Sequence, residues 1–273
     1  MQIIHIDETD STNRWLRNFS ASDEHKQTQA SSVRECPYLS DAVVVVADYQ
    51  TAGRGQGTNT WESERGKNLT FSVLIHPTWV KAARQFILSM VISNAIRRTV
   101  EELLDEEKAK TAKQPDDSHS KVEVKWPNDI YVNGCKICGI LIENTLKGDV
   151  IKDCIMGIGL NVNQRVFRSD APNPVSLLQL SGGTELNRRQ VLERVLQELE
   201  HIISHWDEET ISREYREHLF RREGVHSFHD ADGEFEACIM TVEDDGHLVL
   251  LDTAGKMRRY AFKEVTFILS IKQ

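Results

Sequence analysis

Several features that would assign this chain to a specialised class of protein are missing from its sequence. Its 273 residues contain no stretch approaching the ~18 consecutive apolar residues that a membrane-spanning helix needs. The N-terminus lacks the basic and then apolar order of a signal peptide. Acidic residues outnumber basic ones by 42 to 33, and the net charge of −9 argues against a general nucleic-acid-binding surface. We therefore expect a cytoplasmic protein that partners neither a membrane nor a nucleic acid.

Cysteine is scarce and irregularly spaced. The five cysteines are Cys36, Cys135, Cys138, Cys154 and Cys238. Two of them form a Cys-x-x-Cys pair, but no second pair and no histidine pair follows at the spacing of zinc ligands. Residues three apart in a strand also point to opposite faces, and disulfides are rare in the cytoplasm. We interpret the cysteines as small buried thiols.

The two common glycine motifs of nucleotide-binding proteins are absent too. Neither Gly-x-x-x-x-Gly-Lys-[Ser/Thr] nor Gly-x-Gly-x-x-Gly occurs. In their place, residues 50–57 read Gln-Thr-Ala-Gly-Arg-Gly-Gln-Gly, with a cation at Arg54 and a tryptophan, Trp61, shortly afterwards. Glycines allow backbone amides to approach an anion closely. A plain linker is the alternative, but the segment joins two predicted strands, which favours a ligand-binding loop.

The stretch from residue 125 to residue 143 carries the densest chemical signal. It reads KWPNDIYVNGCKICGILIE, with a proline break, an Asn-Gly hairpin turn and two lysines in β-prone sequence. Burying an unpaired charge costs several kcal/mol, so Lys125 and Lys136 each require an acidic partner. For Lys125 that partner could be Asp129, Glu123 or a bound anion. Lys136 is either a solvated edge-strand lysine or a fixed ammonium beside a reacting carboxylate or phosphate.

Residues near the two lysines have both structural and functional interpretations. Simple strand alternation places Lys136 on the face of Cys138 and puts Gly139 on the opposite face, where a ligand could approach the backbone. Asn128 and Asp129 are turn formers, or Asp129 could hold Mg²⁺ with nucleotide phosphates.

Further on, Gly157 and Gly159 either permit close strand packing or line a cavity, with Asn161 binding a ribose or phosphate.

The apolar pattern predicts an α+β fold. Val43–Val46 is a β-branched run typical of a strand buried on both faces, and apolar residues from Phe86 to Leu104 recur at helical spacing. Residues 20–40 and 105–120 are polar or charged and are interpreted as insertions of unassigned role. Further strands are predicted over residues 2–7, 68–76, 122–126, 130–132, 136–143 and 151–163. Further helices are predicted through Trp15 and Leu16, after N-cap residues at 10–12, and over 187–206 and 208–219.

The character of the sequence changes near Gly224. From there, short alternating segments are separated by turns at residues 230–233, 244–246 and 253–256. About five strands in ~50 residues are typical of a small β-barrel. We therefore predict two domains, a mixed sheet with helices over residues 1–222 and a barrel over residues 223–273.

Together these motifs resemble the biotin protein ligases. The matching segments are Ser11-Thr12-Asn13, Tyr49–Gly55 with Trp61, Lys125–Asp129, Lys136–Glu143 and Gly157–Asn161. The Lys-Trp-Pro-Asn-Asp string, with its spacing to the second lysine, is the most specific of them. The resemblance implies a class II synthetase-like catalytic domain and a C-terminal SH3-like barrel. It also implies an ATP-dependent ligase that forms biotinyl-5′-AMP and pyrophosphate, then passes biotin to a lysine of a biotin carboxyl carrier protein domain.

The resemblance also implies roles for individual residues. The implied biotin site comprises Ser11, Thr12, Asn13, Gln50, Gly53, Arg54, Gly55, Gln56, Lys136, Gly139, Leu141 and Gly157. The implied ATP site comprises Arg54, Trp61, Lys125, Asn128, Asp129, Lys136 and Asn161. Lys136, Arg54 and Asp129 would act in catalysis, with Asp129 holding the cofactor Mg²⁺. Because the biotin carboxylate and the α-phosphate are both anions, cations in a dry pocket are needed to bring them together.

The chain departs from the family's pattern in its glycine segment. Gln56, Gly57, Thr58 and Asn59 stand where family members often carry more arginines, which bears on how the loop closes over the adenylate. The chain also begins almost at the catalytic domain. The resemblance therefore implies a form without a DNA-binding domain or repressor activity, and a monomer or homodimer.

Two other functions compete with biotin ligation. A lipoate or octanoate ligase of the same superfamily would need a long aliphatic tunnel, whereas Ser11, Thr12 and Gln50 suit a ureido ring. A non-catalytic biotin sensor would keep the pocket but would have no use for Asp129 and Lys136.

Overall fold

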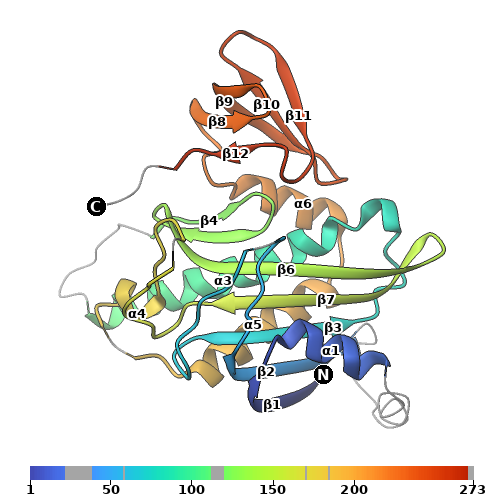
Figure 1. Cartoon of the computed structure of the whole chain (residues 1–273), viewed down its shortest axis with the longest axis vertical. Helices are drawn as coiled ribbons and strands as arrows, with labels where there is room; N and C mark the ends of the chain where they lie inside the picture. The colour runs from blue at the N-terminus through green and yellow to red at the C-terminus, as the bar shows by residue number, and fades with distance from the viewer. Residues whose placement is uncertain (22–38, 58, 112–119, 170, 184, 270–273) are drawn as a thin grey trace.

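A seven-stranded sheet is the larger of the two sheets in the computed structural model, which describes residues 1–21, 39–57, 59–111, 120–169, 171–183 and 185–269. The strand order is β1-β2-β3-β7-β6-β5-β4 (Figure 1). The strands are β1 (Gln2–Thr9), β2 (Val43–Gln50), β3 (Leu69–Ile75), β4 (Val122–Lys125), β5 (Asp129–Val132), β6 (Cys135–Lys147) and β7 (Val150–Leu160). Only β1 and β2 pair in parallel, so the sheet is mixed, as predicted.

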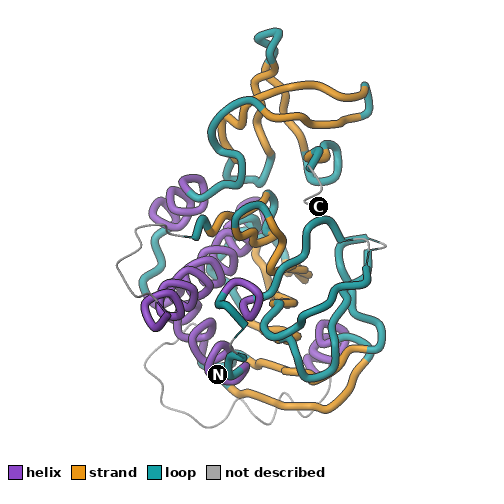
Figure 2. The backbone as a smooth tube through the Cα atoms, turned by 90° about the vertical axis from the view of Figure 1, so that its left-hand side faces the viewer, coloured by secondary structure: helices purple, strands orange, loops and turns teal. Residues whose placement is uncertain are grey.

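Helices cover both faces of this sheet. They are α1 (Thr12–Ala21), the 3₁₀ turn η2 (Ala82–Arg84), α3 (Ile87–Thr111), α4 (Leu177–Leu180), α5 (Arg188–Ser204) and α6 (Glu208–Glu217). Figure 2 shows most of the helices on one side of the strands, and α1 packs on the other face through Leu16. Among the described residues, no helix combines the length and apolar character that crossing a membrane requires.

The valine run of β2 explains why apolar side chains pack on both faces of the sheet. Val43 and Val45 pack with Leu16 of α1, whereas Val44 and Val46 belong to the larger core on the opposite face. Alternate side chains of a strand point to opposite faces, so a strand covered on both sides needs apolar residues at every position. The continuous run therefore predicted this strand correctly.

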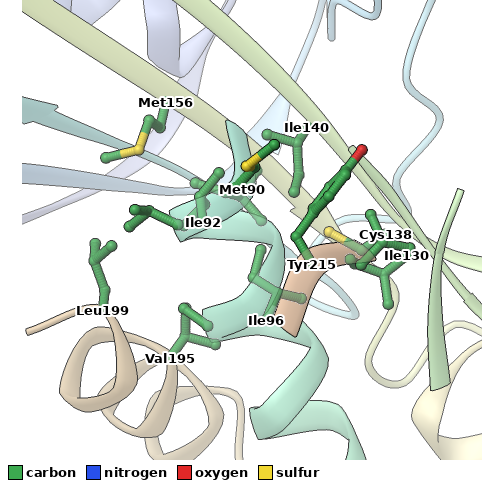
Figure 3. Close-up of a cluster of buried hydrophobic side chains, with 14 of the residues drawn as sticks. Met90, Ile92, Ile96, Ile130, Cys138, Ile140, Met156, Val195, Leu199 and Tyr215 are labelled. Atoms are coloured by element: carbon green, nitrogen blue, oxygen red, sulfur yellow. The ribbon is translucent and has the colours of Figure 1, made fainter. Parts of the chain in front are cut away.

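The larger core fills the space between the sheet and α3. Figure 3 shows Met90, Ile92 and Ile96 of α3 beside side chains of α5 and of strands β5 to β7. Cys138 and Cys154 are fully buried, as predicted, and burial raises the pKa of both thiols. Cys135 and Cys238 are only half-buried, while Cys36 lies outside the described residues.

The second sheet is antiparallel, with the order β11-β10-β9-β8-β12. Its strands are β8 (His226–Asp230), β9 (Gly233–Val242), β10 (Leu248–Asp252), β11 (Met257–Tyr260) and β12 (Thr266–Phe267). The five strands and their turns match the prediction. Within the described residues no pairing joins the end strands β11 and β12, so closure into a barrel is not seen.

The two sheets share one continuous cluster of buried apolar side chains. Trp126, just after β4, donates a hydrogen bond of 2.9 Å from Nε1 to the carbonyl of Gly246 in the second sheet. Phe220 bridges the two parts, with its ring 5.1 Å from Tyr131 and 6.4 Å from Phe267. The predicted boundary between residues 222 and 223 separates the two sheets in sequence, and it stays a prediction for the domains themselves.

Two expectations about local structure need correction. Residues 105–111 were assigned to a charged insertion, but α3 continues to Thr111. Its stripe of apolar residues ends near Leu104, and the last turns are held by ion pairs such as Lys110–Glu107 at 2.6 Å. The insertion predicted over residues 20–40 falls mostly outside the described residues.

Candidate functional site

A cavity of about 860 Å³ lies where the glycine segment, the strands β4 to β7 and the second sheet meet. This volume is in the range of small-molecule sites. Its walls include residues of the N-terminus of α1, the end of β2 and the segment 262–269. Segments distant in sequence therefore come together here, and the second sheet forms one of the walls.

Lys136 projects into this cavity from the β5–β6 hairpin. Its Nζ lies 2.5 Å from Oδ2 of Asp129, and both side chains are about one-fifth exposed. The hairpin turn has φ values of 50° at Asn133 and 80° at Gly134, as the predicted type I′ turn requires. An ammonium held by a carboxylate at a cavity wall can meet a second anion there.

The face of β6 that carries Lys136 differs from the prediction. Ile130 pairs with Cys138 but Tyr131 pairs with Lys136, so the register shifts by one residue at a bulge. A β-carbon placed on Gly139 would lie 3.5 Å from Cε of Lys136. Lys136 therefore shares a face with Gly139, and the prediction from simple alternation was wrong because an inserted residue reverses the faces.

Lys125 is the second cation of the cavity wall. It forms no ion pair with Asp129 or Glu123; Glu123 is instead 2.6 Å from Nζ of Lys121. Its Nζ lies 4.7 Å from the centre of the Phe267 ring in the second sheet. Burial lowers the pKa of Lys125, and the charge of Asp129 offsets this in part. Among the residues that the structure describes, Lys125 has no carboxylate partner, and a half-buried ammonium of this kind favours anion binding.

A hydrogen-bonded polar group closes the end of the cavity near α1. Oε1 of Gln50 accepts bonds from Thr12, from its backbone N at 2.8 Å and from Oγ1 at 3.1 Å. Ser72, which the sequence did not single out, lies within 2.7 Å of Thr12 Oγ1 and 2.6 Å of Asn13 Oδ1. Within the described residues, the hydroxyl of Ser11 and Nε2 of Gln50 make no hydrogen bond and line the cavity. These polar atoms can meet a ligand.

Arg54 is held at the cavity edge by an acidic residue that sequence reasoning did not assign to the site. Its Nη1 lies 3.4 Å from Oε1 of Glu143, which also contacts Arg17 at 2.7 Å. Asn13 donates to the other carboxylate oxygen at 2.9 Å. Burial opposes ionisation of Glu143, but these hydrogen bonds and the arginine charges hold its pKa below the usual range. The sequence feature that could have indicated Glu143 is its position at the polar end of an apolar strand.

Trp61 occupies the space that two strand glycines leave open. A β-carbon on Gly159 would lie 2.3 Å from the indole, and one on Gly139 would lie 2.8 Å from it. The indole Nε1 is buried without a hydrogen-bond partner in the described part of the chain. The close approach predicted at Gly139 is thus made by Trp61. Gly157 likewise leaves room for Asn13: a β-carbon placed on Gly157 would lie 2.1 Å from Oδ1 of Asn13.

Most of the predicted site residues line this single cavity. They are Ser11, Thr12, Asn13, Gln50, Arg54, Gly55, Gln56, Trp61, Lys125, Asn128, Asp129, Lys136, Gly139, Leu141 and Gly157. Gly53 and Asn161 are not among the lining residues. Asn161 is buried and donates to the carbonyl of Val175 at 3.0 Å, and its role at the ATP site stays a prediction. The sequence did not predict that residues of the second sheet, such as Phe262, Lys263 and Phe267, line the cavity.

Metal-ligating groups are few in the site. Asp129 is the only carboxylate among the cavity-lining residues that the structure describes. The one cluster of three such groups in the described ranges, Glu243, Asp245 and His247, lies elsewhere in the second sheet and is paired with Arg259. A single carboxylate suits Mg²⁺ that arrives with nucleotide phosphates, which complete its ligands.

Comparison with known proteins gives the family background. A family model described as the biotin/lipoate A/B protein ligase family matches residues 19–161, just over half of the chain. The bifunctional ligase/repressor BirA of Bacillus subtilis is 30% identical over 158 residues, which is 57% of this chain and 44% of the relative. The biotin–[acetyl-CoA-carboxylase] ligase of Mycobacterium tuberculosis is 32% identical over 166 residues, or 61% and 56% of the two chains. The chain thus spans about half the length of these relatives.

Solved structures share the whole fold. The biotin protein ligase of Aquifex aeolicus in complex with biotin and ATP has a TM-score of 0.67 at 22% identity, over 98% of this chain and 99% of that one. The biotin protein ligase of Leishmania major in complex with biotin has a TM-score of 0.63 at 26% identity, over 96% and 99%. The first likeness establishes the fold, including the second sheet.

Proposed function

Because the chain belongs to the biotin/lipoate A/B protein ligase family, we propose that it joins biotin to a protein lysine at the expense of ATP. The observation that carries this proposal is the Lys136 ammonium, which faces one cavity between a polar end at α1 and a cationic wall at β4. Relatives named as biotin ligases support biotin as the acid. The acceptor we propose is a biotin carboxyl carrier protein domain.

The polar end of the cavity suits the ureido group of biotin. That group offers two N–H donors and a strongly polarised carbonyl acceptor. The Ser11 hydroxyl and Nε2 of Gln50 are available to it, and Thr12 and Asn13 hold the surrounding polar atoms in place. Leu141 and the Trp61 indole would flank the aliphatic chain, which would bring the carboxylate towards Lys136.

The cationic wall suits ATP. Lys136 would neutralise the biotin carboxylate while that group attacks the α-phosphate and displaces pyrophosphate, and the same ammonium would stabilise the added negative charge of the transition state. Asn128, Asp129 and Lys125 line the adjoining wall. Mg²⁺ would be held by Asp129 and the phosphates, and would screen their charge when bound. A lysine amine of the acceptor would then attack the biotinyl carbonyl and release AMP.

Biotin-dependent exchange of labelled pyrophosphate into ATP tests the first step. Lys136→Ala should lower the exchange rate by about two orders of magnitude or more, because a charge that stabilises the transition state is lost. Lys147→Ala is the matched control, since Lys147 lies at the exposed end of the same strand. Lipoate and octanoate should not replace biotin. Biotin binding without any exchange in the unmodified chain would refute the proposal.

A further inference from the structure

We propose that Lys263, in the turn before β12, binds the outer phosphates of ATP; this inference rests on the proposed function. The turn is closed by a hydrogen bond of 3.1 Å from Glu264 N to Ala261 O, and the Glu264 carboxylate accepts from Ala261 N at 2.7 Å. Lys263 lines the same cavity as Lys125 and Lys136. The second sheet would thus contribute a charged group to the nucleotide site.

The side chain of Lys263 reaches across to the glycine segment. A β-carbon placed on Gly57 would lie 2.8 Å from Nζ of Lys263, so the ammonium lies beside the loop at Gly57. In the described part of that segment Arg54 is the only cation, and it faces Glu143. Lys263 therefore places a positive charge next to glycines, whose backbone amides can also bind an anion.

Among the residues that the structure describes, no carboxylate pairs with Lys263. Within the described ranges it forms no ion pair, whereas Lys136 is held by Asp129 and Arg54 by Glu143. In the described part of the chain, the cavity wall thus presents the cations Arg54, Lys125, Lys136 and Lys263 and one carboxylate, that of Asp129. Such an excess favours a polyanion such as a triphosphate.

The backbone at Lys263 is also unusual. Its φ of 75° lies in the left-handed region, which residues with a β-carbon rarely adopt. Conformations of this kind persist where the surrounding structure imposes them, and they gather at ligand sites. Lys263 is exposed at the mouth of the cavity, whereas Lys136 is largely enclosed. This placement assigns Lys263 to the departing pyrophosphate rather than to the α-phosphate.

The experiment compares Lys263→Met with Lys256→Met in biotin-dependent ATP–pyrophosphate exchange. Lys256 is an exposed lysine in another turn of the same sheet and does not line the cavity. We expect Lys263→Met to raise the KM for ATP and for pyrophosphate roughly tenfold, as loss of a charge-assisted bond does. The KM for biotin should stay unchanged, and Lys263→Arg should retain most of the affinity for ATP.

A second measurement separates this inference from the proposed function. Transfer of biotin from supplied biotinyl-5′-AMP to a carrier protein domain needs no outer phosphates, so Lys263→Met should leave its rate unchanged. Thermal unfolding should show that the variant is folded. An unchanged KM for ATP with normal exchange would overturn the role of Lys263 alone. Absence of both exchange and transfer in the unmodified chain would overturn the proposed function, and this inference with it.

Discussion

At the scale of single residues, the packing of Trp61 against Gly159 determines the shape of the cavity. Gly159→Ala would place a methyl group 2.3 Å from the indole, so the ring or the strand must move. We expect a loss of ~1–3 kcal/mol in the free energy of unfolding, as overpacking typically costs. In a Trp61→Ala background the same substitution should cost almost nothing. Urea unfolding of the four chains measures this coupling, and an equal cost in both backgrounds would contradict the packing.

At the residue scale, contiguous motifs in the sequence pointed to residues that the structure brings together, while their roles stay predictions. Thr12, Gln50, Asp129 and Lys136 sit in short, distinctive strings, and all four line the cavity. Ser72 escaped notice because its contact with Thr12 joins residues 60 apart in the chain. A serine within a strand gives no local sign of such a partner.

At the scale of elements, the ion pairs between α3 and α6 make part of the stability depend on pH. Glu214 of α6 contacts Arg97 at 2.8 Å and Arg98 at 2.6 Å. Burial opposes its ionisation, but bonds from Arg98 and Arg97 and their charges hold its pKa below the ordinary value of 4.5. The carboxylate therefore stabilises the fold above that pH, and this contribution is lost as the pH falls through the lower native pKa.

Glu214→Gln should lower the free energy of unfolding at neutral pH by roughly 2 kcal/mol, because Arg97 and Arg98 both lose a charged hydrogen-bond partner and the buried Arg97 keeps only Glu101. The difference from the unmodified chain should shrink as the pH falls below 4.5, which chemical denaturation at a series of pH values would measure. Glu217→Gln, an exposed position on the same helix, is the control and should change little. A difference independent of pH would contradict the assignment.

Most elements could be predicted because their signals are local. The valine run of β2, the apolar stripe of α3 and the Asn-Gly turn at residues 133–134 each specify one element. The bulge between β5 and β6 could not be predicted, because it depends on how two strands pair and not on either strand alone. That single shift decides which face of β6 carries Lys136.

At the scale of the whole molecule, the site lies between two sheets, and its second wall could not be predicted from sequence. Trp126 and Lys125 meet residues more than 100 positions further along the chain, namely Gly246 and Phe267. The number of strands in the second sheet followed from regularly spaced turns, but turns do not say where a sheet docks. Its position explains why a small antiparallel sheet belongs to the candidate active site.

Substitution of Phe267 tests whether the second sheet helps to form the nucleotide site. Its ring packs under Lys125 and lines the cavity, whereas Phe235 of the same sheet lies under Arg258, with its guanidinium carbon 4.3 Å from the ring centre, away from the cavity. Replacing either ring by leucine should cost a similar ~1 kcal/mol of stability. Only Phe267→Leu removes the surface that positions Lys125, so it alone should raise the KM for ATP several-fold, as loss of a cation–π contact of ~1–2 kcal/mol predicts. Steady-state exchange kinetics and thermal unfolding of both variants measure these effects. Equal KM values for ATP in the two variants would mean that the second sheet supports the fold without shaping the nucleotide site.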